Sequence, residues 1–473
     1  MVFNSLTFLV FFAVVMAMYY LLPIGWTGRK VVLLVASYIF YAAWNPPFVL
    51  LLIASTVIDW EIAKRMAASE RPSYRRALLG FSLVFNLGVL AFFKYGGFLL
   101  ENFTRLVAMF GVEYQPPEWS IILPIGISFY TFLTLSYTID VYYRVMEPGR
   151  SFLDYAFFIT FFPHLVAGPI IRAADFLPQC VEPRRATRDQ LGWGLALMVL
   201  GLFEKVILAD TLLAPAADTV FGAASRAGFI DAWTGTLAFS AQIFFDFAGY
   251  TTTAIGCALC LGFVLTDNFR FPYAAVGFSD FWRRWHISLS TWLRDYLYVP
   301  LGGNRRGAAR TQVNLMLTML IGGLWHGAAW RFVVWGALHG TYLVAERRAR
   351  QLWGGARVWS VPLMQLALAL GTYALVCVTW VYFRAHSLAD AWRISRAMLL
   401  GGSDQMLLTN QDRAIVVGIT VLLLAAHWRM RASSIEDEWK GLPRWLRPVV
   451  LASMVLAICL ASGDERAFIY FQF

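Results

Sequence analysis

The chain has 473 residues, of which 59% are hydrophobic and 14% are charged. Soluble domains are about 45–50% apolar and about 25% charged, so this composition excludes an ordinary soluble domain and predicts a membrane protein. The net charge of +10 lies in short loops between apolar runs. That distribution is the positive-inside pattern of a membrane protein and argues against a nucleic-acid partner.

Apolar runs suited to helices in the hydrocarbon core recur along the whole chain. We expect them at residues 3–22, 31–44, 47–63, 77–100, 120–143, 152–170, 192–212, 232–264, 311–344, 360–384, 413–428 and 446–462. The first run has no preceding cation and no small-residue cleavage site, so we interpret it as an uncleaved helix. The expected fold class is an all-α polytopic integral membrane protein, a single domain over residues 1–473 with about 10–12 membrane helices.

At three places along these runs we predict a broken or re-entrant helix. The second and third runs meet at Asn45-Pro46-Pro47, while runs 232–264 and 311–344 exceed one crossing and contain glycines. Irregular backbone survives at membrane depth only where protein or a water-filled cavity satisfies its polar groups. We therefore expect the chemistry of the protein at such segments.

Basic loops predict the orientation of the chain in the membrane. The positive-inside rule is satisfied when the loops at 23–30, 61–76, 182–188, 346–358 and 429–447 lie in the cytoplasm. Both termini then lie on the far side of the membrane.

His326 lies deep in an apolar run, in the segment GGLWHGAAW (residues 322–330). Neutral imidazole is a general base, and the flanking glycines would let the backbone bend and a substrate approach. Trp325 lies beside this histidine, and His339 further along is a supporting partner or a packing residue. A buried histidine satisfied by a neighbour is the alternative interpretation of His326, and spacing alone does not separate the two.

His286 lies in FWRRWHISLSTWLRDYLY (residues 281–298). On a helical wheel the tryptophans and leucines form one stripe, Arg283, Arg284 and Arg294 lie on the other side, and His286 lies at the stripe's edge. One interpretation is an in-plane amphipathic helix with tryptophan anchors. The other is a helix at a cavity rim, with the arginines near an anionic donor and His286 pointing inward. The pattern leaves both open.

Asp246 lies among aromatic residues in the segment QIFFDFAGY. A buried carboxylate must be paired or protonated, so we expect a structural ion pair with Arg144, Arg172 or Lys205. No Walker loop, nucleophile elbow or zinc-ligand spacing occurs in the sequence. We therefore expect no metal and no permanently bound cofactor.

At these segments the sequence resembles the membrane-bound O-acyltransferase superfamily, and within it the bacterial alginate O-acetyltransferase membrane subunits and related exopolysaccharide acetylases. The motifs FWRRWHISLSTWLRDYLY and GLWHGAAW carry the resemblance, supported in order by MVFNSLTFLVFF, ASYIFYAAWNP, LPIGISFYTF, FFPHLVAGPI, QIFFDFAGY and the closing FIYFQF. One departure is that relatives commonly read FDFSGYSDMAIG, where this chain has Ala248, Thr251 and Thr252. This chain therefore lacks the second acid of its relatives, and any role of that second carboxylate in handling a partner or acceptor does not carry over.

The resemblance implies a central tunnel open to the cytoplasm, with His326 at the histidine position most associated with activity and His286 at its companion polar position. It implies acetyl-CoA as acyl donor. The acetyl group would cross the bacterial inner membrane for O-acetylation of an exopolysaccharide such as alginate or cellulose, directly or through a periplasmic acetyltransferase partner.

On this basis we expect His326 to act as general base on an acceptor hydroxyl. Arg283, Arg284 and the loop residues Arg305 and Arg306 are candidates to hold the phosphates of the donor. Ordinary positive-inside charge is the alternative for that loop. Two rival functions are D-alanyl transfer from a carrier protein to teichoic acid, and transport, although no two-half repeat typical of many transporters is visible.

Overall fold

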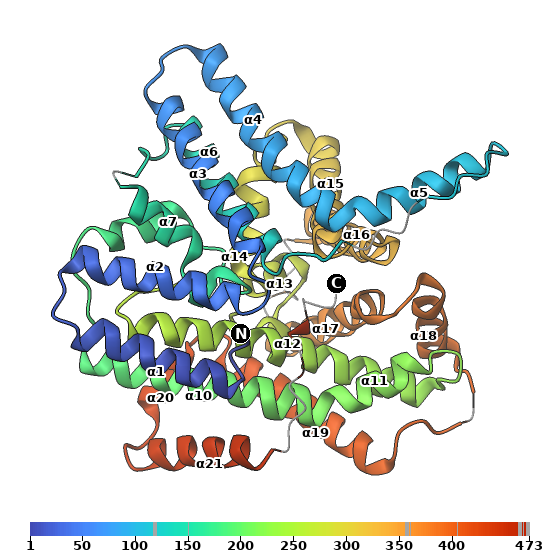
Figure 1. Ribbon diagram of the computed structural model, residues 1–473. Coiled ribbons are helices and arrows are strands. Elements are labelled where there is room, and N and C mark those ends of the chain that lie inside the picture. Colours follow the sequence, from blue (N-terminus) through green and yellow to red (C-terminus); the bar gives the residue numbers. More distant parts are fainter. Residues whose placement is uncertain are drawn as a thin grey trace. The chain divides into compact units, whose positions relative to one another are not determined.

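The computed structural model describes residues 1–116, 121–149, 151–354, 359, 361–403, 405–461, 466, 468 and 469, and every regular element in them is helical (Figure 1). Contacts divide the chain into two compact units. The first is Met1–Leu195 with Ala254–Thr266, and the second is Ala196–Thr253 with Asp267–Phe473. The sequence-based expectation of one integral domain stays a prediction.

The first unit holds, in chain order, α1 (Leu6–Leu21), α2 (Trp26–Ala42), α3 (Phe48–Ala67), α4 (Pro72–Leu90), the π-helix η1 (Ala91–Tyr95), α5 (Gly96–Ala108), α6 (Ile127–Tyr142), α7 (Phe152–Thr160), α8 (Phe162–Leu165), α9 (Ala173–Phe176), the 3-10 helix η2 (Leu177–Cys180) and the first half of α10 (Arg188–Phe203). The predicted break at Asn45-Pro46-Pro47 is confirmed, because α2 ends before it and α3 begins after it. Helices α3, α4 and α6 pack together. Between α3 and α4, the buried Asp59 carboxylate accepts hydrogen bonds from Ser82 Oγ at 2.6 Å and Asn86 Nδ2 at 2.9 Å.

The second unit continues with the π-helix η3 (Glu204–Leu213), α11 (Ala214–Gly222), most of α12 (Phe229–Cys260), the 3-10 helix η4 (Pro272–Ala274), α13 (Phe278–Arg284), α14 (Ile287–Leu293), the π-helix η5 (Arg294–Tyr298), α15 (Gly307–His326), α16 (Trp330–Trp353), α17 (Pro362–Arg384), α18 (Leu388–Leu400), α19 (Asn410–Met430), α20 (Ile435–Gly441) and α21 (Leu446–Leu460). The predicted break in run 311–344 is confirmed, since α15 and α16 are separate helices. The predicted break in run 232–264 is wrong, because α12 is continuous. Its Gly249 instead allows close packing, since a Cβ there would lie 2.5 Å from the carbonyl oxygen of Gly201.

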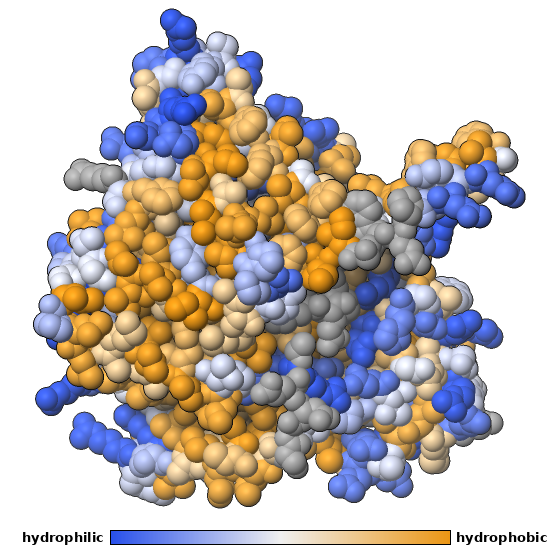
Figure 2. Space-filling model, viewed as in Figure 1, coloured by the Kyte–Doolittle hydropathy of each residue, from blue (hydrophilic) through white to orange (hydrophobic). Residues whose placement is uncertain are grey.

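Helices suited to a bilayer occur in both units. Among the described residues, five helical stretches are long and apolar enough to cross a membrane, namely Pro72–Ala108, Arg188–Gly222, Phe229–Cys260, Pro362–Arg384 and Asn410–Met430, and Leu6–Leu21 and Leu446–Leu460 are shorter apolar helices. Figure 2 shows that hydrophobic side chains cover much of the visible surface over α1 to α4. These features confirm the all-α polytopic membrane class, while the number of spans, the orientation and the central tunnel stay predictions.

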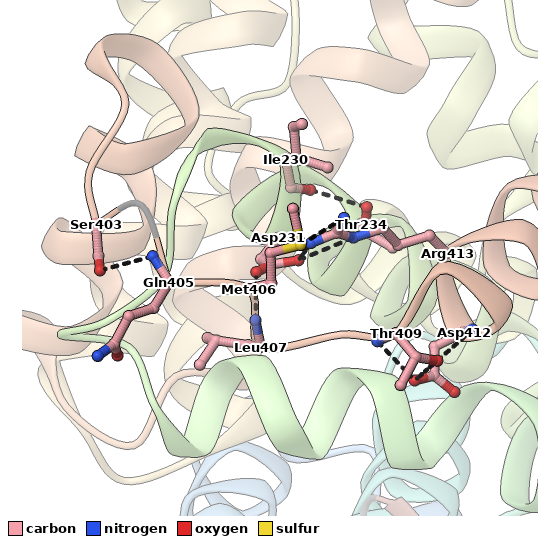
Figure 3. A network of polar contacts seen from close by, with 10 residues as sticks. All are labelled: Ile230, Asp231, Thr234, Ser403, Gln405, Met406, Leu407, Thr409, Asp412 and Arg413. Carbon is pink, nitrogen blue, oxygen red and sulfur yellow. Dashed lines mark hydrogen bonds and ion pairs between the residues drawn. The ribbon is translucent and has the colours of Figure 1, made fainter.

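A buried ion pair ties the connection between α18 and α19 to the start of α12 (Figure 3). Asp231, 2% exposed, accepts from Arg413 Nη2 at 2.8 Å and from the Leu407 amide at 2.7 Å. Thr409 and Asp412 form a capping box that starts α19. The polar backbone of the loop is thereby anchored to a helix of its own unit.

Candidate active site

His326 is the last residue of α15, where the chain reverses into α16. A Cβ on Gly323 would collide with the carbonyl oxygen of Phe332, and one on Gly327 would overlap the Phe332 ring. Glycine is therefore required at both positions for the two helices to touch. The turn sets His326 at the end of this tight helix pair.

Aromatic rings enclose the imidazole of His326, which is only 3% exposed. Its ring centroid lies 5.0 Å from that of Trp325, 4.9 Å from that of Trp335 and 5.3 Å from that of Phe383. These rings restrict the orientation of the imidazole and exclude bulk water. A site of this kind would suppress hydrolysis of a reactive acyl donor.

His286 lies in a turn with a left-handed backbone, at φ 43°. Its Nδ1 lies 3.1 Å from Asn268 Oδ1, which also accepts from Ser288 Oγ at 2.9 Å. As the amide is oriented, this oxygen is an acceptor, so the proton of the imidazole is on Nδ1 and the lone pair is on Nε2. A non-glycine residue in this region is uncommon, and such strain concentrates at functional sites.

The continuous helix that the wheel assumed over residues 281–298 is wrong. The chain forms α13 and α14 with a break at Trp285 and His286, because Asn268 hydrogen-bonds across the turn. His286 is fully buried rather than at the edge of a stripe. Burial lowers the pKa of His286 to about 3, so its imidazole is neutral at physiological pH.

His339 supports the aromatic wall behind His326. Its ring centroid lies 4.6 Å from that of Trp335 and 5.0 Å from that of Trp282. Its Nε2 donates to Thr379 Oγ1 at 3.0 Å, since that hydroxyl donates its own proton to a backbone carbonyl. His339 therefore holds Trp335 against His326 by packing and by one oriented hydrogen bond.

Asp246 forms a buried ion pair, as expected, and Lys205 is its partner. Lys205 Nζ also lies 3.0 Å from Asp210 Oδ1. The other Asp246 oxygen accepts the backbone N–H of Ile469 at 2.9 Å. Lys205 belongs to the π-helix η3, and such bulges in α-helices recur at functional sites.

Aromatic side chains connect this ion pair with His286, and sequence reasoning missed them. Phe247, next to Asp246, lies 4.7 Å from His286 between ring centroids and 5.5 Å from Phe468. Tyr250 lies 4.8 Å from Phe468. Phe468 begins the closing motif FIYFQF, and nothing in the pattern of that motif indicates where it packs. Residues 470–473 of the motif lie outside those described.

A cavity of about 810 Å³ lies beside the two short helices, lined by residues of α13 to α16. Arg283 and Arg294 line it, whereas Arg284 pairs with Asp280 at 2.9 Å and does not line it. Trp282 also lines the cavity, with its ring centroid 5.8 Å from that of Trp335. His326 is not among the lining residues, so aromatic side chains separate it from this space.

Arg305 and Arg306 are exposed residues just before α15. Neither lines the 810 Å³ cavity or a second cavity of about 600 Å³ beside α13, α16 and α17, and their role in donor binding stays a prediction. Within the described part of the chain, no group of three or more histidine, cysteine or acidic side chains is placed to hold a metal ion.

Comparison with known proteins relates this geometry to a family. The profile of the MBOAT, membrane-bound O-acyltransferase family, matches residues 144–360, a range that includes every predicted site residue. A protein of Azotobacter vinelandii named Probable alginate O-acetylase AlgI is 44% identical over 427 residues, covering 90% of this chain and 83% of that protein. The chain belongs to the membrane-bound O-acyltransferase family.

Other relatives in this O-acyltransferase family carry related names. A Pseudomonas aeruginosa protein, also named Probable alginate O-acetylase AlgI, is 44% identical over 89% of this chain and 79% of its own length. A Helicobacter pylori protein named Peptidoglycan O-acetyltransferase is 36% identical over 80% of this chain and 77% of its own length. The family resemblance inferred from the motifs is confirmed. This chain is a membrane-bound O-acyltransferase, and the transporter alternative is set aside.

Proposed function

We propose that this enzyme transfers an acetyl group from acetyl-CoA to a polysaccharide hydroxyl, with His326 as general base. The observation that supports this role is the position of His326 at the end of α15, enclosed by Trp325, Trp335 and Phe383 and nearly inaccessible to solvent. A base in such a site would act on a bound hydroxyl rather than on bulk water.

The proposed reaction is a direct acyl transfer. The acceptor oxygen attacks the thioester carbonyl carbon while His326 takes the hydroxyl proton. The tetrahedral intermediate then collapses, the C–S bond breaks, and the thiolate leaves with the proton from the imidazolium. A positioned histidine contributes about 10²–10⁴-fold to such a step, and alignment of the two substrates adds further acceleration.

The neighbouring residues take positioning roles in this proposal. His286 is proposed to position the reacting groups, and Asn268 fixes the orientation of its imidazole by binding Nδ1. Trp282 must turn aside for the acetyl end of the donor to pass from the 810 Å³ cavity toward His326. The ion pair of Asp246 and Lys205 holds in place the neighbouring Phe247, whose ring contacts His286.

The donor side is proposed to be the cytoplasm and the acceptor side the periplasm of a bacterial inner membrane. This orientation follows from the basic loops and has both termini in the periplasm. The names of the relatives support a polysaccharide acceptor such as alginate or peptidoglycan. Delivery through a periplasmic acetyltransferase partner is compatible with the same chemistry.

The test uses the full chain in proteoliposomes, with donor outside and acceptor polysaccharide inside. Labelled acetyl-CoA and a D-alanyl carrier protein are supplied in parallel, with and without a periplasmic extract. We expect the acetyl label alone to reach the luminal polysaccharide. Transfer from the carrier protein with none from acetyl-CoA would replace the acetyl donor with an aminoacyl carrier.

A further inference from the structure

The cavity of about 810 Å³ in the second unit has an unequal charge lining. Arg283, Arg294, Arg347 and Arg350 line it, against two carboxylates, Asp280 and Glu346. The arginines come from α13, η5 and α16, three elements that meet at this space. The lining therefore carries more positive than negative charge, because Asp280 and Glu346 are its acidic residues.

Two of these arginines are neutralised where they lie. Arg350 Nε lies 2.7 Å from Glu346 Oε1, and Arg294 Nε lies 2.6 Å from Asp295 Oδ1. The Asp280 carboxylate is engaged by Arg284 rather than by an arginine of the cavity wall. The lining acids are thus already occupied by other cations.

Arg283 and Arg347 differ from that pair. Among the residues that the structure describes, neither has a carboxylate within ion-pair distance, and the buried Nε of Arg347 has no hydrogen-bond acceptor. A guanidinium presents a planar set of donors that matches phosphate oxygens, and an unsatisfied buried donor is costly without a ligand. Arg347, with its unsatisfied buried Nε, and the exposed Arg283 line the same cavity, and together they suit an anionic group with several oxygens.

We propose that Arg347, together with Arg283, binds the phosphates of the acyl donor. This inference rests on the proposed acetyl transfer and names residues that hold the donor for it. A carrier-protein prosthetic arm brings a single phosphodiester, whereas coenzyme A brings a diphosphate and a further monophosphate. Arg347 was not singled out in the sequence, because its loop-proximal position looks like ordinary positive-inside charge.

The position of the cavity agrees with this assignment. Trp282 lines the same space and contacts Trp335, which contacts His326. A donor whose phosphates lie at Arg347 and Arg283 would direct its pantetheine arm along the rings of Trp282 and Trp335, toward His326. Arg283 also lines the 600 Å³ cavity, so it lies where the two spaces adjoin.

The experiment compares Arg347→Gln and Arg283→Gln with Arg348→Gln in the full-length protein. Arg348 is the matched control, since it is on the same helix, is exposed, bonds Gln312 at 2.8 Å and lines neither cavity. Binding of coenzyme A and of pantetheine is measured by titration calorimetry in zwitterionic nanodiscs. Transfer kinetics are then measured with acetyl-CoA and with acetyl-pantetheine.

We expect Arg347→Gln to weaken coenzyme A binding and to raise the KM for acetyl-CoA by about 10- to 100-fold, with Arg283→Gln in the same direction. Values for pantetheine and acetyl-pantetheine should not change, and Arg348→Gln should match wild type. Equal coenzyme A affinity in Arg347→Gln and Arg348→Gln would overturn the proposal even if acetyl transfer proceeds. If neither thioester supports transfer, the proposed function fails, and calorimetry still decides the phosphate site.

A lipid headgroup is the other source of phosphate at a membrane surface. The titrations are therefore repeated in nanodiscs that contain phosphatidylglycerol. Unchanged coenzyme A affinity supports the donor assignment. The opposite outcome is that phosphatidylglycerol abolishes coenzyme A binding to the wild-type protein but does not change the affinity of Arg347→Gln. That result would assign the site to lipid and refute the donor assignment.

Discussion

Replacement of Lys205 by Met should be far more costly than replacement of Asp246 by Asn. Lys205 contacts two carboxylates, Asp246 and Asp210, and all three side chains are nearly inaccessible to solvent. Lys205→Met would leave two buried acids facing each other without a cation. Asp246→Asn would leave Lys205 paired with Asp210 at 3.0 Å, and the amide oxygen could still accept the N–H of Ile469.

Removal of one partner from a buried ion pair costs about 3–5 kcal/mol, which we expect for Lys205→Met. For Asp246→Asn we expect about 1–3 kcal/mol, the range for one charged hydrogen bond. The double variant should be less destabilised than the sum of the two, by at least about 1 kcal/mol, because the residues are in direct contact.

The assay is unfolding of the purified protein in mixed micelles, with Asp210→Asn as a third single variant. Equal losses for Lys205→Met and Asp246→Asn would refute the reasoning that Lys205 serves two acids. Additivity of the double variant within about 0.5 kcal/mol would refute direct coupling between Lys205 and Asp246.

Three further predictions concern the backbone, the histidine turn and the loop anchor. Gly323→Ala should lower the free energy of unfolding by about 1–3 kcal/mol and impair transfer, because its Cβ would meet a backbone carbonyl oxygen. The control Gly322→Ala, whose Cβ would meet only a leucine methyl at 3.1 Å, should be tolerated. Thermal unfolding of both variants is the measurement. The pKa of His286 is lowered to about 3, so its burial as a neutral imidazole is fully compatible with the fold above pH 6.5. As pH falls from 6.5 toward 3, the free energy of unfolding should decrease by up to about 1.4 kcal/mol per pH unit. His286→Asn should flatten this dependence, measured as the melting temperature against pH. Arg413→Ala should leave the buried Asp231 unpaired and cost about 3–5 kcal/mol, whereas a loss below about 1 kcal/mol would show that the ion pair of Figure 3 is not a stabilising anchor.

The parts of the site that sequence reasoning predicted are those with a local signature. An apolar run interrupted by glycines around a histidine predicted the turn between α15 and α16 and the burial of His326. A carboxylate among aromatic residues predicted an ion pair, although three cations were possible partners and only the fold selects Lys205.

The parts that were missed depend on residues distant in the chain or on backbone groups. The amide of Asn268 breaks the expected helix at His286, and no periodic pattern reveals a capping side chain in a preceding loop. Ile469 contacts Asp246 through its backbone N–H, which every residue except proline carries. Arg347 is distinguished from its neighbour Arg348 by lining the 810 Å³ cavity and by its buried Nε without an acceptor, and neither feature has a signature in the sequence.

The central claim is that His326 is the general base of an O-acyl transfer. The most direct measurement is kcat for acetyl transfer by His326→Gln in proteoliposomes, with the exposed His386→Gln as matched control and unfolding curves to establish that both variants are folded. The account predicts a loss in kcat of about 10²- to 10⁴-fold for His326→Gln, an unchanged KM for acetyl-CoA, and wild-type rates for His386→Gln. A folded His326→Gln enzyme with a rate close to that of wild type would contradict it.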